Sequence, residues 1–284
     1  MKTGAIAVVL LLSIVLVSSF ACGSEEETVP TPTSTPTSAL PTVGSFENVL
    51  LIGDFWLSPK QLPSGWSPGN RWDDASHLLQ VEGFKVHSSE STSITRELLA
   101  DYGIVVIGRN PPLLTDEMTL IVDWIEAGGS ALFAIHSCSD CSFGDTDFNS
   151  MLLPLYGIQV NDDAVTDPIH ISDSGSILGN IYTGVINEHL TTQNVSKLEF
   201  MDFQQLPSLK LSDDNTETIV QGEKDAYSEY YTSNPPLAAA AEHKGGRVIV
   251  VTGSWYHTFS DRIIEFSDNQ LFFLNIINWL AHKS

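Results

Sequence analysis

The chain has 284 residues, a formal net charge of −22 at pH 7 and only 13 lysines and arginines. This balance excludes binding to nucleic acid, or to anionic lipid, through a broad basic surface, because phosphates bind where Lys and Arg gather. The length allows one α/β domain beyond the N-terminal segments described next.

The first residues resemble a bacterial lipoprotein signal. Lys2 precedes a nearly continuous apolar run over residues 5–17, which has the length of a signal-peptide core and is short for a membrane span. Small residues then lead to Cys22. We therefore expect residues 1–21 to be a signal peptide and Cys22 to be lipidated. This predicts attachment to the extracytoplasmic face of a bacterial membrane, in the cell envelope.

A tether is predicted over residues 22–45. Three consecutive glutamates at 25–27 are followed by a stretch dense in Thr, Pro and Ser. Such a composition cannot bury a core and favours an extended, semi-rigid spacer. Residues 46–284 remain for the folded domain.

The domain begins with alternating short strands and helices. The apolar run 49–53 predicts a buried strand, and residues 54–70 predict a long loop at its carboxyl end, where ligands of open α/β sheets bind. Asp54 and Trp56 lie in this loop. We then expect, in order, a helix over 72–81, a strand over 84–87 and a helix over 94–99.

The clearest unit is strand, helix, strand. Residues 104–107 are wholly apolar, as in a strand buried on both faces of a parallel sheet. Thr115 can cap a helix whose apolar residues recur at helical spacing as far as Ile125. Two glycines end it, and residues 130–135 form the next buried strand. This pattern predicts a βαβ crossover.

The second half is less regular. Three aspartates, Asp162, Asp163 and Asp167, could supply oxygen ligands to Ca²⁺. Their spacing does not match an EF-hand, and turn and capping chemistry is favoured. The remaining predicted elements are a helix over 148–156, a strand over 158–160, weak strands between 169 and 216 (notably 197–201 and 208–211), strands over 218–221, 237–241 and 247–252, and a final helix from Asp268 to about residue 280.

Three motifs in this order resemble a known family. They are DYGIVVIG at 101–108 with WIEAGGSAL at 124–132, LPLYGIQVNDDAV at 153–165, and GRVIVVTGS at 246–254. They are similar to glutamine-amidotransferase-like domains without amidotransferase activity. Such domains occur in gliding-motility ABC-transporter auxiliary proteins and at the N-terminus of an intraflagellar-transport subunit. The resemblance implies a flavodoxin-like three-layer α/β/α sandwich with a mostly parallel sheet, in a binding or assembly role.

The active relatives in that superfamily place a nucleophilic cysteine between glycines, as Gly-x-Cys-x-Gly, and a histidine after a late strand. Here the matching positions are Cys138 and His257, but the flanking glycines are missing. A strained elbow needs small neighbours. The departure favours a non-enzymatic domain. A hydrolase or amidotransferase-like enzyme that uses Cys138 or Ser137 with His257 is the alternative.

Cys138 and Cys141 are three positions apart. In an exported protein this spacing favours a disulfide between them. A redox pair, a metal role, or free thiols stay open. Two cysteines without a second such pair make a weak zinc signal, so we predict no metal and no cofactor.

The candidate ligand-binding residues follow predicted strand ends. They are Asp54, Trp56, Arg109, Asn110, His136 and His257. The sequence therefore predicts a lipid-anchored, non-enzymatic binding or assembly domain whose partner is a protein or a glycan. The tryptophan-rich loop also leaves a carbohydrate-binding lipoprotein as an alternative.

Overall fold

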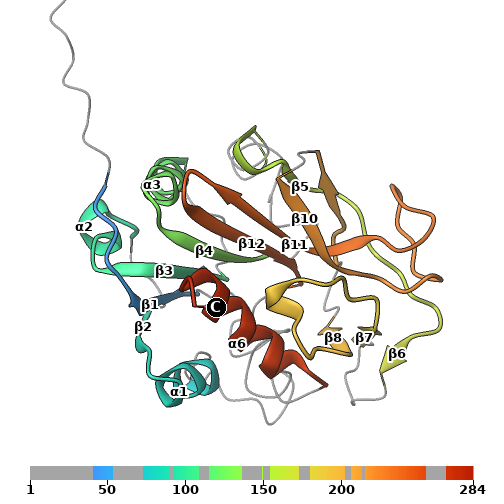
Figure 1. The fold of residues 1–284 in the computed structure, drawn as a ribbon. Helices are drawn as coiled ribbons and strands as arrows, with labels where there is room; N and C mark the ends of the chain where they lie inside the picture. The colour runs from blue at the N-terminus through green and yellow to red at the C-terminus, as the bar shows by residue number, and fades with distance from the viewer. Residues whose placement is uncertain are drawn as a thin grey trace, which may run out of the picture. The chain divides into compact units, whose positions relative to one another are not determined.

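The computed structural model describes residues 41–53, 73–89, 93–108, 115–135, 149, 154–172, 180–201, 206–212, 215–253 and 267–283. Its main feature is a seven-stranded sheet with the order β10-β11-β12-β4-β3-β1-β2 (Figure 1). The strands are β1 (Ser45–Ile52), β2 (Lys85–Ser89), β3 (Tyr102–Ile107), β4 (Ser130–Ile135), β10 (Thr216–Gln221), β11 (Pro236–His243) and β12 (Gly246–Thr252).

The sheet is mostly parallel. β2, β1, β3, β4 and β12 pair in parallel with their neighbours. β11 runs antiparallel to both β12 and β10. It follows that β10 points in the same direction as the five parallel strands. The protein is therefore a mixed α/β protein with a large, mostly parallel central sheet.

Alternate strand residues belong to different hydrophobic clusters. Leu51 and Val106 join a cluster with residues of α1 (Asp73–Val81) and α6 (Asn269–Leu280). Their chain neighbours Leu50 and Val105 join a second cluster with residues of α2 (Arg96–Leu99) and α3 (Thr115–Glu126). These four side chains are fully buried. Burial of each such side chain stabilises the folded state by roughly 1.5–3 kcal/mol. Because these strands bury side chains on both faces of the sheet, their sequences are apolar throughout rather than alternating.

The turn between α3 and β4 shows why two glycines end that helix. Gly128 has φ of 107°, a conformation that L side chains rarely adopt. Gly129 lies under the Trp124 ring, and a Cβ there would be 2.5 Å from ring atoms. The indole of Trp124 is fully buried. The two glycines thus let the chain reverse closely beneath a large core side chain.

Two small antiparallel sheets accompany the main one. β5 (Ile158–Val160) pairs with β9 (Leu209–Leu211). β7 (Asn180–Thr183) pairs with β6 (Ile171–Ser172) on one side and with β8 (Leu198–Met201) on the other. A 3-10 turn, η1 (Leu190–Thr192), lies between β7 and β8 in the sequence.

The described elements agree with most of the sequence predictions. The apolar strands and the helices at 73–81, 96–99, 115–126 and 269–280 all lie within a few residues of the predicted bounds. β6 and β7 lie in the stretch 169–216, for which the sequence predicts weak strands without giving bounds for these two. Of the predicted helix at 148–156, the described residues 149 and 154–156 are helical. Within the described part of the chain, no helix is both long and apolar enough to cross a membrane.

Candidate functional site

The carboxyl ends of the parallel strands meet at one edge of the main sheet. Ile52 at the end of β1 pairs with Ile107 at the end of β3, and the amide of Gly108 donates to the Ile52 carbonyl at 2.9 Å. Ile135 at the end of β4 likewise pairs with Thr252 at the end of β12. This carboxyl edge is where open α/β sheets bind ligands.

The sequence-predicted site residues follow these strand ends in the chain. All of them lie outside the described residues, so their arrangement stays a prediction. They are Asp54 and Trp56 after β1, Arg109 and Asn110 after β3, His136, Ser137, Cys138 and Cys141 after β4, and His257 after β12. The predicted lipidation site, Cys22, also lies outside the described residues.

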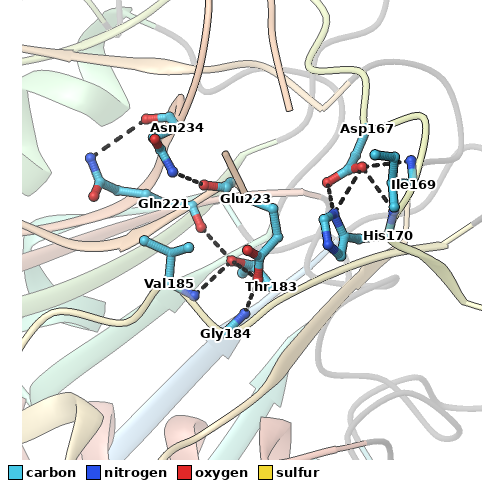
Figure 2. Close-up of polar contacts among 10 residues, drawn as sticks. Asp167, Ile169, His170, Thr183, Gly184, Val185, Gln221, Glu223 and Asn234 are labelled. Atoms are coloured by element: carbon cyan, nitrogen blue, oxygen red, sulfur yellow. Dashed lines mark hydrogen bonds and ion pairs between the residues drawn. The ribbon is translucent and has the colours of Figure 1, made fainter. Parts of the chain in front are cut away.

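The described part of the carboxyl edge is the loop between β10 and β11, residues 222–235. Gln221 pairs with Pro236 across its base, and the Thr252 hydroxyl donates to the Leu237 carbonyl at 3.0 Å. The loop therefore starts and ends beside the carboxyl end of β12. The end of β7 contacts Gln221 and Glu223 where the loop starts (Figure 2), and Thr166 pairs with Tyr227 within the loop.

A carboxylate joins the loop to the end of β7. Glu223 Oε1 accepts a hydrogen bond from the Gly184 amide at 2.6 Å. The Thr183 hydroxyl donates to the Gln221 carbonyl at 2.6 Å and accepts from the Val185 amide at 3.0 Å. Figure 2 shows these side chains converging between the two segments. Glu223 Oε1 and the Thr183 hydroxyl both bind backbone groups, which makes this junction a structural clamp.

The loop is also closed on itself. The Gly222 amide donates to the Pro235 carbonyl at 2.8 Å, and Asn234 Nδ2 donates to the Gly222 carbonyl at 3.0 Å. Asn234 has φ of 47°, a left-handed conformation that Asn tolerates better than most residues. Ala226 in the middle of the loop is fully buried. These contacts hold the loop in one conformation.

An aspartate orients a histidine beside the clamp. The buried carboxylate of Asp167 accepts hydrogen bonds from the amides of Ile169 and His170, at 2.9 and 2.8 Å. It also lies 3.0 Å from His170 Nδ1 (Figure 2). Because a carboxylate only accepts, Nδ1 must carry the proton. Nε2 is then left to accept in the neutral ring, and no hydrogen bond to Nε2 occurs among the described residues.

His170 contacts an aromatic ring that a lysine also covers. The His170 and Tyr182 rings meet edge to face, with centroids 5.5 Å apart. Lys197 Nζ lies 3.8 Å from the centroid of the Tyr182 ring, a cation–π contact. The His170 side chain is 23% exposed, so this imidazole is held in one orientation and is accessible from one side. Such a group can bind a polar ligand.

A second aspartate performs turn chemistry. The Asp163 carboxylate accepts from the Ser208 amide at 2.7 Å and from the Ser208 hydroxyl at 2.6 Å. With Asp167, it therefore binds backbone N–H groups, as the capping interpretation predicts. Across the described ranges, no group of three or more His, Cys, Asp or Glu side chains is placed to hold a metal ion.

Exposed apolar side chains gather on the same two segments. Residues 166–171 and the 222–235 loop are joined by a two-way backbone pairing of Thr166 with Tyr227, at 2.8 and 2.9 Å. Four large apolar side chains on these segments are about half or more exposed: Ile169, Ile171, Tyr227 and Tyr230. Nearby, Tyr231 is turned inward. Its hydroxyl donates to the Leu209 carbonyl at 2.7 Å, and burial is the largest of the effects that raise its pKa.

No sequence pattern described above pointed to Glu223, Thr183, His170 or these tyrosines. Two signals could have pointed to His170 and the tyrosines, and none marks Glu223 or Thr183. One is the Asp-Pro-x-His run at 167–170, in which a turn residue precedes a histidine by three positions. The other is the cluster of three tyrosines at 227–231 in an otherwise polar stretch between two apolar strands.

Comparison with known proteins gives a fold only. No family model matches the sequence, and no curated protein matches it. Among solved structures, the mmIFT52 N-terminal domain matches with a TM-score of 0.61 and 18% identity, over 82% of this chain and 97% of that one. The cytoplasmic protein STM1381 from Salmonella typhimurium LT2 matches with a TM-score of 0.54 and 17% identity, over 82% and 99%.

A putative thua-like protein from Bacteroides uniformis also matches, with a TM-score of 0.52 and 13% identity, over 88% of this chain and 95% of that one. These structures share a glutamine-amidotransferase-like fold. The likeness therefore supports such a fold for this chain. At these identities it carries no information on activity or ligand.

Proposed function

We propose that this protein is a lipid-anchored, extracytoplasmic domain that binds or assembles with a partner and catalyses no reaction. The observation that carries the proposal is the use of polar side chains at the described carboxyl edge. Glu223, Thr183 and Asp167 bind backbone amides and carbonyls instead of being presented to a ligand. An edge built in this way is a rigid platform, which suits recognition.

We infer a flavodoxin-like three-layer α/β/α sandwich of the non-catalytic gliding-motility and intraflagellar-transport type. Two facts support it: alternate strand residues pack with different helices, and the mmIFT52 N-terminal domain matches over most of both chains. The three sequence motifs point to the same type.

The absence of glycines around Cys138 supports a non-catalytic role. A reactive cysteine at a strand end needs a sharp backbone turn, and the residues on either side of Cys138 all carry side chains. In this proposal Cys138 and Cys141 form a disulfide, which removes the thiolate that catalysis would need. Anchoring through Cys22 and the tether at 22–45 would hold the domain away from the membrane surface.

The test is a turnover assay on purified protein with panels of esters, thioesters and amides. We expect no turnover above that of buffer. Turnover that is lost in Cys138→Ala, in Ser137→Ala or in His257→Ala would overturn the proposal in favour of a hydrolase. Thiol labelling of the native protein before and after reductant gives an independent readout. Cys138 and Cys141 should react only after reduction.

A further inference from the structure

We use the name tyrosine patch for four exposed side chains on the two segments that the pairing of Thr166 with Tyr227 joins: Ile169, Ile171, Tyr227 and Tyr230. Their exposed fractions are 61%, 51%, 48% and 59%. Only six large hydrophobic side chains are exposed among the described residues, and the other two, Val81 and Leu190, lie elsewhere in the sequence. Large apolar side chains that stay exposed on two paired segments of a folded domain point to a site of interaction more than scattered single residues do.

The patch is pre-organised. The loop that presents Tyr227 and Tyr230 is closed at its base by Gly222 and Pro235, and its middle is fixed by the pairing of Tyr227 with Thr166. A further backbone hydrogen bond, from the Ser228 amide to the Tyr231 carbonyl, measures 2.8 Å and encloses Tyr230. Rigid tyrosines lose little conformational entropy on binding. The patch therefore has the properties of a recognition surface.

Two exposed carboxylates lie in the same loop as Tyr227 and Tyr230. Asp225 and Glu229 are exposed and flank Tyr227 in the sequence, two positions away on either side. Neither forms an ion pair with any described residue. The whole chain has a net charge of −22. An exposed aromatic ring beside unpaired carboxylates is suited to a cation, which the ring face attracts and the carboxylate neutralises.

We propose that the tyrosine patch is a docking surface for a cationic segment of a partner protein, with arginine or lysine side chains on the faces of Tyr227 and Tyr230. Asp225 and Glu229 would pair with the same cations. Ile169 and Ile171 would contact the aliphatic part of the segment. This inference rests on the proposed function, because it assumes that the domain binds a partner and does not turn over a substrate.

Contacts between a cation and an aromatic ring already occur within the protein. Lys197 Nζ lies 3.8 Å from the centre of the Tyr182 ring. The Arg247 guanidinium lies 4.8 Å from the centre of the Trp279 ring and is paired with Glu242 at 2.7 Å.

Two alternative occupants of the tyrosine patch are less favoured. A second copy of the chain would bring two strongly acidic surfaces together, and a neutral glycan would gain no charge pairing from Asp225 and Glu229.

The test measures binding of a short peptide of alternating arginine and glycine to the full chain by calorimetry at low salt. A citrulline peptide of the same length is the uncharged control. Because Tyr227→Ser with Tyr230→Ser removes both cation–π contacts, it should weaken arginine-peptide binding by about tenfold. Tyr227→Phe with Tyr230→Phe keeps both rings and should retain binding within about twofold.

A charge-matched pair of variants separates the patch from the general acidity of the chain. Asp225→Asn with Glu229→Gln should weaken binding several-fold. Glu82→Gln with Glu188→Gln, which removes two exposed carboxylates elsewhere, should change it by less than about twofold. Unchanged thermal unfolding shows that each variant is folded.

Three results would overturn the inference. The serine variant could bind the arginine peptide as wild type does, the citrulline peptide could bind equally well, or the two acidic pairs could have equal effects. Binding of a neutral glycan that the serine variant abolishes would also overturn it, in favour of a carbohydrate site.

The turnover assay distinguishes failure of the proposed function from failure of the tyrosine-patch inference. Turnover contradicts the proposed function, whereas no turnover together with no peptide binding contradicts the tyrosine patch alone.

Discussion

The Glu223 carboxylate binds the Gly184 amide at 2.6 Å and so joins two segments that are 39 positions apart in the chain. One segment leaves β10 of the main sheet, and the other leaves β7 of the small three-stranded sheet. The contact thus connects the two sheets at the carboxyl edge. Its contribution to the free energy of unfolding can be measured directly.

We expect Glu223→Ala to lower the free energy of unfolding by about 1–3 kcal/mol, because hydrogen bonds to charged groups are stronger than neutral ones and Gly184 would lose its partner. Glu223→Gln keeps an oxygen acceptor and should lose about half as much. Urea unfolding and hydrogen exchange at the Gly184 amide are the measurements. Glu229→Ala, at an exposed site in the same loop, should change stability by less than about 0.5 kcal/mol. Equal stability of Glu223→Ala and wild type would contradict the clamp.

Asp268 should make stability fall at acid pH. Its carboxylate accepts from the hydroxyl and the amide of Ser196, both at 2.7 Å, and from the Lys197 amide at 3.0 Å. The Ser196 side chain first, and the backbone hydrogen bonds after it, lower the pKa of Asp268 below its ordinary 3.8. A lowered carboxyl pKa means that the unfolded chain takes up the proton first. The contribution is therefore complete above the ordinary value and is lost as the pH falls through the folded value.

Urea unfolding between pH 2 and pH 6 tests this prediction. Asp268→Asn should be less stable than wild type near pH 6, and the difference should shrink as the pH falls. Glu188→Gln, at an exposed site, is the control. A difference between Asp268→Asn and wild type that does not change with pH would refute the proposed linkage.

His189 should also make the stability fall as the pH falls, but over a higher pH range than Asp268. Burial is the main cause that lowers its pKa below the ordinary 6.5. Nδ1 accepts from the Thr191 amide at 3.1 Å, and the ring packs edge to face on Trp279 with centroids 5.2 Å apart. Protonation at Nδ1 would replace an acceptor with a donor and break the contact with Thr191. Stability from this group is thus complete above 6.5 and is lost as the pH falls below it.

His189→Asn keeps a capping acceptor but does not titrate. It should flatten the pH dependence of unfolding below the ordinary histidine pKa of 6.5. The pKa of His282 is also lowered by burial, so His282→Gln should remove a further part of the slope. The same slope in wild type and in the double variant would show that neither histidine is responsible.

Gly129→Ala should destabilise the core. A Cβ at this position would lie 2.5 Å from the Trp124 ring, which is fully buried and cannot move aside freely. Overpacking of this kind costs about 1–3 kcal/mol. Gly184→Ala is the matched control, because a Cβ there would have its nearest neighbour at an ordinary 3.4 Å. Thermal and urea unfolding of both variants give the comparison. Equal losses at the two positions would contradict the packing argument.

Lipidation at Cys22 gives a fifth prediction. Wild-type protein expressed in bacteria should incorporate a clickable fatty acid and fractionate with membranes. Cys22→Ser should lose both properties, whereas Cys138→Ser with Cys141→Ser should keep them. Fatty-acid incorporation in Cys22→Ser would show that the anchor lies elsewhere.

Most of the main sheet could be predicted from the sequence because its strands are buried on both faces. Runs such as those of β3, β4 and β12 are continuous and apolar. Gly128 and Gly129 mark the turn between α3 and β4. β7 could not be predicted in this way. Ile181, Tyr182 and Thr183 in this strand alternate between buried and half-buried, and the strand's end is fixed by a hydrogen bond from the Thr183 hydroxyl to the carbonyl of Gln221, which is 38 positions away.

The described part of the site was missed for a related reason. Glu223 and His170 are ordinary polar loop residues until long-range pairing places them beside Gly184 and Tyr182. The general location was predictable, since the carboxyl edge of an α/β sheet follows from the strand directions. The side chains that meet there depend on how the loop between β10 and β11 crosses the chain near Thr166.

The pairing of Thr166 with Tyr227 has a mechanical consequence. Its two hydrogen bonds run in opposite directions between segments that are otherwise distant in the chain. A pull on Tyr227 would load both bonds together and pass through the base of the loop into β10 and β11. If a partner docks on the tyrosine patch and pulls on it, the central sheet would bear that tension.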